Sequence, residues 1–228
     1  MCGRYTLIAD LSFLMDRFEV PEDSLDYKPS YNIAPTDRVP VVFHDGRYRR
    51  AEMMRWGLVP YWSKEPRTRA PHINARAEGL QDSRMFGNAW QGRRRCLVPA
   101  DSFYEWRTSA DRGPFRITLA SGEPFAFAGL WERWRPKAGQ AGGPFSSMTI
   151  VTTGPNDLIV PIHDRMPVVL PREAEAMWLD PSVEPEAALT LLKPYPAEAM
   201  RMYAVSSLVN NVRNNGPELI ESVTRLGD

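Results

Sequence analysis

Apolar and polar residues alternate along much of the chain, and this pattern predicts many short β-strands. Asp45-Gly46 separates the first two apolar runs and is typical of a β-hairpin. Residues 31–36 are rich in turn-forming residues and predict a fixed loop rather than a strand. The expected strands cover residues 39–43, 47–56, 96–99, 102–106, 115–119, 124–131, 148–153, 168–170 and 201–205.

Helical periodicity is confined to a few short segments. Leu11, Leu14, Met15 and Phe18 form an apolar stripe, so we expect a helix over residues 10–18 capped by Asp10. Further helices are expected from the 72–78 cluster through residue 86, from 154–156, and over 172–179, 184–193 and 217–223. Many strands with few helices predict an α+β fold. We expect one domain over 1–228, with a curved, barrel-like, mostly antiparallel β core flanked by short helices.

Composition is typical of a globular protein made in a reducing compartment. Of the 228 residues, 43% are hydrophobic and 25% are charged. No apolar run approaches the ~18 residues of a membrane span, and no signal peptide is recognisable. The two cysteines, Cys2 and Cys96, do not form a disulfide framework. We therefore expect a cytoplasmic protein without a membrane partner, in which Cys96 is a small buried hydrophobe.

The type of basic residue is more informative than the net charge, which is zero. Only four of the 28 basic residues are lysines, so 24 are arginines, the residue that binds phosphate bidentately. A codon bias toward arginine explains the excess equally well. All four lysines lie in polar or proline-flanked segments that resemble loops: 28, 64, 137 and 193. If this protein forms a Schiff base, its N-terminal amine is therefore the better candidate.

Cys2 becomes the first residue if Met1 is removed, which the small cysteine side chain allows. A terminal cysteine carries an α-amine of pKa ~7.7–8.0, against ~10.4 for lysine, so part of it is neutral near pH 7. The neighbouring thiol has a pKa near ~8.5, which a cation such as Arg4 lowers. An amine and a thiol on adjacent carbons condense with an aldehyde to a five-membered thiazolidine. The alternative is that Cys2 is an accident of a frayed terminus.

Two aromatic segments are candidates for ligand binding. Residues 56–62 are either a strand end with core aromatics or a stacking platform for bases or sugars. Glu105 lies between Tyr104 and Trp106, and desolvation there would raise its pKa into a useful acid/base range. The alternative is that Glu105 faces outward in an alternating strand. Because it shares a face with Phe103, that alternative is weakened.

Three polar clusters complete the set of candidates. His163-Asp164-Arg165 combines a proton carrier, an anion and a cation, or else holds a histidine satisfied by a turn. Asn74 and Arg76 offer neutral and charged donors two residues apart, or else a helix cap and a solvated arginine. The triplet at 93–95 predicts a solvated strand start rather than a phosphate patch.

These clusters, in this order, resemble the SOS-response-associated peptidase (SRAP) family, which crosslinks to abasic sites in single-stranded DNA. The residues that carry the resemblance run from the terminus to the last third of the chain: 1–5, 31–36, 56–60, 74–76, 96–101, 103–106 and 162–167, with 205–206 and 209–211 in the tail. Two positions depart from the pattern. Ser102 stands where glycine is expected, and Gly79 where threonine is expected.

The resemblance implies a role for each candidate. Cys2 is expected to attack the sugar aldehyde and close the thiazolidine, with Glu105 and His163 moving protons and Asn74 holding the sugar hydroxyl. The residues expected to bind DNA are Arg4, Arg76, Arg165, Trp106, Trp62 and Pro35. The expected partner is single-stranded DNA containing abasic sites, bound by a nucleoid-associated monomer without metal or cofactor. Weak lyase activity and a self-processing peptidase activity are also implied.

Two other classes of function remain open from the sequence. One is an N-terminal-nucleophile amidohydrolase, in which the Cys2 thiol attacks an amide and its own amine is the base. That class requires an oxyanion hole and leaves the aromatic and arginine clusters unexplained. The other is a single-stranded DNA binding module without chemistry, which would tolerate loss of Cys2 and bind with strong salt dependence.

Overall fold

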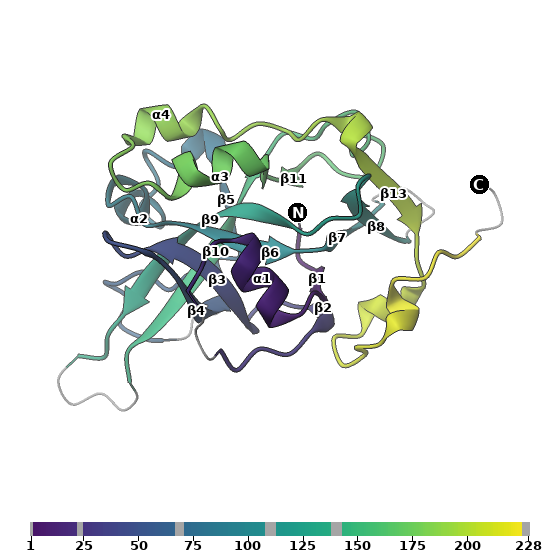
Figure 1. Ribbon diagram of the computed structural model, residues 1–228, viewed down its shortest axis with the longest axis horizontal. Coiled ribbons are helices and arrows are strands. Elements are labelled where there is room, and N and C mark those ends of the chain that lie inside the picture. Colours follow the sequence, from purple (N-terminus) through teal and green to yellow (C-terminus); the bar gives the residue numbers. More distant parts are fainter. Residues whose placement is uncertain (1, 22–24, 67–70, 108–112, 138–142, 225–228) are drawn as a thin grey trace.

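The computed structural model describes residues 2–21, 25–66, 71–107, 113–137 and 143–224 (Figure 1). The strands are β1 (Tyr5–Leu7), β2 (Ser30–Ile33), β3 (Arg38–His44), β4 (Arg49–Trp56), β5 (Asn74–Arg76), β6 (Arg95–Ala100), β7 (Ser102–Trp106), β8 (Pro114–Leu119), β9 (Phe125–Trp134), β10 (Phe145–Thr153), β11 (Met166–Pro167), β12 (Val169–Leu170) and β13 (Met200–Ala204). The α-helices are α1 (Leu11–Arg17), α2 (Gly87–Gln91), α3 (Arg172–Leu179) and α4 (Pro185–Leu189). Short 3-10 helices are η1 (Ala77–Gly79), η2 (Ala197–Ala199), η3 (Ser207–Asn210) and η4 (Pro217–Leu219).

Five strands close into a barrel. They follow the order β10-β4-β3-β6-β9, and β9 pairs again with β10 to complete the ring. Within this ring only the β10–β4 pair is parallel. Closure matters because a ring of paired strands leaves few open sheet edges. The α+β class and the barrel-like, mostly antiparallel core expected from the sequence are thereby confirmed.

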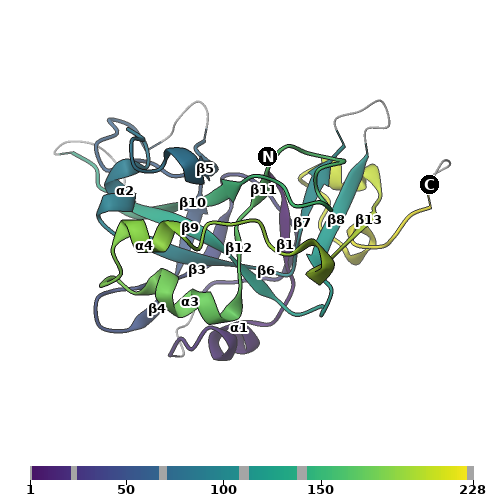
Figure 2. The same ribbon diagram turned by 90° about the horizontal axis from the view of Figure 1, so that it is seen from above.

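A second, five-stranded antiparallel sheet packs against the barrel, in the order β13-β8-β7-β1-β2. Its inner face contributes Tyr5 and Phe103, whose rings lie 5.7 and 6.0 Å from the ring of Phe127 on β9. Edge-to-face contacts of this kind stabilise a shared core. Strand β1 is the first strand of the chain, yet it lies inside this sheet, between β7 and β2. Figure 2 shows β1 close to β7.

The helices cover the outside of the barrel (Figure 1). Trp178 on α3 is fully buried, and its indole N–H donates to the carbonyl of Cys96 on β6 at 2.9 Å. Arg17 on α1 forms a bidentate ion pair with Glu175 on α3, at 2.8 and 2.9 Å. No helix in the described ranges is long and apolar enough to cross a membrane.

Several local predictions were wrong because long-range pairing overrode local propensity. The segment predicted as a helix through residue 86 begins as β5, since residues 74–76 pair in parallel with β10. Within that segment η1 is the one helix, and α2 begins only after it, at Gly87. The predicted loop at 31–36 contains strand β2, residues 154–156 start no helix, and residues 217–219 form a 3-10 turn. Asp10 occupies the N-cap of α1, but its side chain makes no capping hydrogen bond.

We predict that Gly129→Ala destabilises the barrel. A methyl group at Gly129 on β9 would lie 2.8 Å from Cys96 Sγ, 3.0 Å from Val98 Cγ2 and 3.1 Å from the carbonyl oxygen of Thr149. Overpacking of this kind costs about 1–3 kcal/mol. Urea denaturation measures the loss. Gly79→Ala is the matched control, because no atom lies within 4 Å of its added methyl. Equal stabilities of the two variants would contradict the packing model.

Candidate functional site

The N-terminal segment is held in place rather than frayed. Tyr104 on β7 donates its backbone N–H to the carbonyl of Arg4 at 2.9 Å, which extends the β1–β7 ladder toward the terminus. The side chain of Cys2 is completely buried, and its thiol donates to the same carbonyl at 3.8 Å. Cys2 is therefore part of the packed structure. Met1 lies outside the described residues, so its expected removal stays a prediction.

Asn74 reaches Cys2 from the other side. Strand β5 carries Asn74 opposite Ile150 on β10. The side-chain amide of Asn74 donates to the carbonyl oxygen of Cys2 at 2.9 Å. Its own oxygen, Oδ1, is buried and accepts no hydrogen bond within the described part of the chain. An unsatisfied buried acceptor costs free energy, so this oxygen is suited to receive a ligand hydroxyl.

Glu105 is the buried carboxyl of the site, with 2% of its surface exposed. It lies on β7, two residues from the buried Phe103. Burial raises the pKa of Glu105 to about 7. The prediction of a desolvated glutamate is confirmed, and the alternative of an outward-facing one is wrong.

The Cys2 thiol shares this environment. Burial is the main cause that raises its pKa, and the charge of Glu105 adds to the rise. The thiol therefore stays protonated at neutral pH, contrary to the expectation that a nearby cation lowers its pKa. A thiol of this kind needs a neighbouring base before it attacks an electrophile.

The loop that precedes β11 contributes His163. Its Nδ1 accepts the backbone N–H of Arg165 at 2.9 Å, and Asp164 Oδ1 lies 2.9 Å from the same nitrogen. Burial lowers the pKa of His163 and outweighs the opposing charge of Asp164. The charge of Asp164 also contributes to the raised pKa of Glu105, so this loop lies on the Glu105 side of the site.

The three arginines predicted to bind phosphate differ in their surroundings. Arg165 donates to both carboxylate oxygens of Glu78, at 2.7 and 2.9 Å, and to the carbonyl of Thr152. Arg4 donates to Asn32 Oδ1 and to the carbonyl of Val209, both at 2.7 Å. Arg76 is exposed at the end of β5. Of these three arginines, Arg76 alone makes no side-chain hydrogen bond to the described residues. DNA binding by all three stays a prediction.

The aromatic side chains are split between the core and the surface. Trp56 is completely buried and packs edge-on against Tyr5 at 5.2 Å, so it is a core residue and not part of a stacking platform. Trp62 is 41% exposed, and the guanidinium of Arg84 lies 5.5 Å from its ring. Trp106 lies 5.8 Å from the guanidinium of Arg4. Pro35 is partly buried in the loop after β2. The roles of Trp62 and Pro35 stay predictions.

Sequence reasoning missed the residue that ties the C-terminal segment to the site. Asn32 is 4% exposed, and its amide donates to the carbonyls of Asn211 and Asn214 at 3.1 and 2.8 Å. Its oxygen accepts from Arg4, so Asn32 positions both. The available signal was a polar residue next to the apolar Ile33, but the turn propensity of Asn32 points to a loop. Trp106 is anchored to the same segment, because its indole N–H donates to Asn210 Oδ1 at 2.8 Å.

The arginine triplet is structural. Arg95 is 2% exposed and donates to the carbonyls of Asp180 and Val183. Arg93 and Arg94 form ion pairs with Glu184 and Glu132 respectively. The predicted strand start is confirmed, since β6 begins at Arg95, but the prediction that this side chain is solvated is wrong. The three arginines join the start of β6 to the α3–α4 region and to β9.

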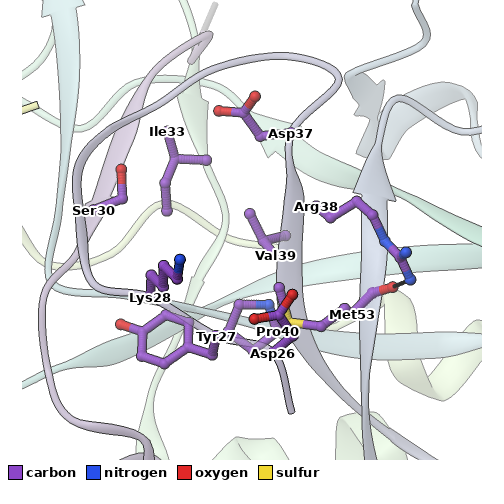
Figure 3. A pocket seen from close by; sticks show the side chains of 10 residues that line it. All are labelled: Asp26, Tyr27, Lys28, Ser30, Ile33, Asp37, Arg38, Val39, Pro40 and Met53. Carbon is purple, nitrogen blue, oxygen red and sulfur yellow. Dashed lines mark hydrogen bonds between the residues drawn. The ribbon is translucent and has the colours of Figure 1, made fainter. Parts of the chain in front are cut away.

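The cavity shown in Figure 3 is separate from the residues around Cys2. It has a volume of about 340 Å³ and lies beside β2 and β3. Asp26, Lys28 and Arg38 line it, and the guanidinium of Arg38 donates to the carbonyl of Met53 at 2.8 Å. Cys2, Asn74, Glu105 and His163 are not among its lining residues. Across the described ranges, no three His, Cys, Asp or Glu side chains form a metal-binding group.

Comparison with known proteins reveals relatives along nearly the whole chain. Abasic site processing protein YoqW of Bacillus subtilis (strain 168) is 44% identical over 229 residues, which span 97% of this chain and 100% of the relative. Abasic site processing protein YedK of Escherichia coli (strain K12) is 33% identical over 98% of this chain and 100% of its own. Abasic site processing protein HMCES of Xenopus tropicalis is 32% identical over 88% of this chain and 68% of its own.

Solved structures and a family model agree with these relatives. The crystal structure of a protein from Bacteroides thetaiotaomicron superimposes with a TM-score of 0.87 at 25% identity, over 98% of this chain and 100% of the other. One from Bordetella bronchiseptica gives a TM-score of 0.77 at 29% identity, over 90% and 100%. The model of the family described as SOS response associated peptidase (SRAP) matches residues 1–212. This chain therefore belongs to the SRAP family.

Proposed function

We propose that this protein processes abasic sites in single-stranded DNA by forming a covalent thiazolidine through Cys2. The observation that carries the proposal is the buried cluster around Cys2. Asn74 binds the Cys2 carbonyl, and Glu105 lies close enough to raise the pKa of the Cys2 thiol. The names of the relatives, abasic site processing proteins, support the choice of substrate.

The proposed reaction begins once Met1 is removed and the nitrogen of Cys2 is a free amine. An abasic deoxyribose opens to expose an aldehyde at C1′. The amine adds to this carbon and gives a carbinolamine, which loses water to form an imine. The thiol sulfur then bonds to the same carbon while its proton passes to the imine nitrogen. The net change is the loss of one water and the formation of one C–N and one C–S bond.

Glu105 is the proposed acid/base group of this sequence. A carboxyl with a pKa of about 7 is present in both protonation states near neutral pH. It therefore donates a proton to the opening ring oxygen in one state and accepts one in the other. The raised pKa of the buried thiol makes such a base necessary, because the thiol does not ionise by itself at neutral pH.

His163 and Asn74 complete the proposed chemistry. His163 is neutral at pH 7, since burial lowers its pKa, and a neutral imidazole relays a proton between its two nitrogens. Asn74 Oδ1, the buried acceptor without a partner in the described chain, accepts the hydrogen of the sugar or carbinolamine hydroxyl. The bond from Asn74 Nδ2 to Cys2 holds the attacking residue in position.

The DNA strand is proposed to lie over the exposed groups around this cluster. Arg76 is free to bind a flanking phosphate, while Arg4 and Arg165 supply positive charge from fixed positions. Trp106 and Trp62 offer ring surface for base stacking. Pro35 lies in the loop after β2, next to Thr36, which has a positive φ of 82°. An imine intermediate also permits β-elimination, so weak lyase activity is expected beside crosslinking.

The surroundings of Cys2 favour this chemistry over amide hydrolysis. Reactive thiol nucleophiles usually have a lowered pKa in an electropositive site. The Cys2 thiol is buried and its pKa is raised. An imine formed by the amine brings the electrophile to this thiol, which does not then need to be a thiolate in the resting protein.

We predict that Cys2→Ala abolishes the stable adduct with an abasic-site oligonucleotide. The variant keeps a terminal amine after Met1 removal, so borohydride should still trap its imine, whereas no ring closes without the thiol. Denaturing electrophoresis with and without reductant measures both species. A heat-stable adduct of Cys2→Ala without reductant would refute the thiazolidine.

A control with an uncleaved residue before Cys2 tests the amine. The nitrogen is then an amide, whose lone pair is delocalised into the peptide bond. This protein should bind abasic DNA and fail to crosslink, with intact mass confirming the extra residue. Crosslinking at the full rate would exclude the amine as nucleophile and favour the amidohydrolase class.

Glu105→Gln is expected to slow crosslinking by about 10²–10⁴-fold while leaving DNA binding nearly unchanged. The amide has the same shape as the carboxyl but moves no proton at neutral pH. Single-turnover crosslinking gives the rate, and anisotropy with an intact oligonucleotide gives the affinity. Equal losses in rate and affinity would indicate a structural role for Glu105.

The same variant tests the raised pKa through stability. Glu105 has a pKa of about 7 when folded, against an ordinary value of 4.5. Between these values the folded protein binds more protons than the unfolded chain, so its free energy of unfolding falls as pH rises. The slope reaches at most about 1.36 kcal/mol per pH unit. Urea denaturation gives the free energy of unfolding of wild type and of Glu105→Gln. From about pH 5 to 7 the value for wild type should fall relative to that for Glu105→Gln, and above pH 7 the difference should stay constant. A constant difference would contradict the assignment.

A further inference from the structure

The outer face of the five-stranded sheet contains a polar hollow that the proposed reaction does not use. It has a volume of about 410 Å³ and lies at β8, β13 and the turn after β8. Its polar lining consists of Asp101, Arg116, Thr118, Ser121, Arg201 and Tyr203. Ile8, which also lines it, follows Cys2 by six residues, a reach of at most roughly 20 Å at about 3.3 Å per residue.

Arg116 is held in a fixed orientation within this hollow. Its Nε donates to Ser102 Oγ at 2.8 Å, and one terminal nitrogen, Nη1, donates to the hydroxyl of Tyr203 at 2.5 Å. Ser102 is completely buried and pairs with the hydroxyl of Thr6 at 2.6 Å. Tyr203 donates in turn to the carbonyl of Ile220 at 3.1 Å. The other terminal nitrogen of Arg116, Nη2, has no hydrogen bond within the described residues and is available to a ligand.

Arg201 lies next to Arg116 on the same face. The β8–β13 register pairs Tyr203 with Arg116 and Arg201 with Thr118, so the two arginines are diagonal neighbours. Diagonal positions have Cβ atoms roughly 7–8 Å apart, within reach of two long side chains. Arg201 is exposed and forms no ion pair in the described part of the chain. Two neighbouring cations repel each other unless an anion lies between them.

The hollow has one carboxylate, Asp101, which also binds the backbone. Asp101 accepts the backbone N–H of Ile8 through Oδ2, in a short hydrogen bond. Burial raises the pKa of Asp101, and the positive charge of Arg116 opposes this rise. Asp101 contributes at most one negative charge, against the two positive charges of Arg116 and Arg201. The hollow therefore keeps a net positive charge. The hydroxyls of Thr118 and Ser121 add neutral donors around it.

We propose that this hollow binds a phosphate group between Arg116 and Arg201. Guanidinium groups match phosphate oxygens bidentately, and hydroxyls supply the remaining hydrogen bonds. The phosphate belongs either to the DNA strand that continues from the Cys2 site or to a small phosphorylated molecule. The DNA source rests on the proposed function, whereas phosphate binding itself does not.

Arg201→Glu tests the DNA source, with Arg135→Glu as the matched control. Arg135 is also exposed, directly follows β9 of the barrel, and does not line the hollow. The probe is an intact single-stranded oligonucleotide of about 20 nucleotides, without an abasic site, so failure of the Cys2 chemistry does not affect the result. Losing one phosphate contact should lower the slope of log K against log salt by about 0.7 for Arg201→Glu. The slope of Arg135→Glu should stay at the wild-type value.

Inorganic phosphate tests the site itself. Its titration at constant ionic strength should shift the NMR signal of Arg116 Nε–H, and chloride should not. Ser102→Gly removes the anchor of Arg116 and should weaken this response. If phosphate shifts the NMR signal but Arg201→Glu keeps the wild-type salt slope for DNA binding, the site binds a small phosphorylated molecule. If Arg201→Glu lowers that slope, the site binds the DNA strand. If phosphate leaves the signal unmoved and Arg201→Glu keeps the wild-type slope, the site does not exist.

Discussion

The backbone pairing of the N-terminal strand is the constraint on which the site depends. β1 lies between β2 and β7, and the hydrogen bond from Tyr104 to Arg4 extends this pairing beyond the strand. Chain termini are usually exposed and poorly ordered unless a sheet holds them. Here the sheet carries Cys2 into the interior, where it meets side chains from β5 and β7. Cys2 thereby gains a fixed position near the start of the chain.

Burial then sets the electrostatics of the cluster. Removing carboxyl and thiol groups from water favours their neutral forms, which raises the pKa of both Glu105 and Cys2. The same effect favours neutral His163, whose pKa falls. Burial thus favours the neutral form of all three groups, and Glu105, with a pKa of about 7, is present in both protonation states near neutral pH.

The C-terminal segment reinforces this arrangement from the outside. Asn32 binds both Arg4 and the carbonyls of residues 211 and 214, and Tyr104 donates to the carbonyl of Tyr31. Residues far apart in the sequence therefore share one network around Arg4 and Trp106. These contacts join the C-terminal segment to the residues beside Cys2.

The sequence by itself determined the local elements and the identity of the chemical groups. The period of Arg172–Leu179 specified α3 at its observed bounds, and the alternation at Ser102–Trp106 specified β7 with Glu105 turned inward. Only the tertiary structure decided that residues 74–76 pair with β10, that Trp56 is core and that Arg95 is buried. It also decided that Cys2, Asn74 and Glu105 meet. The physical reason is that the periodicity of a segment indicates which of its faces is apolar. The burial, pKa and hydrogen-bond partners of a side chain depend instead on segments that are distant in the chain.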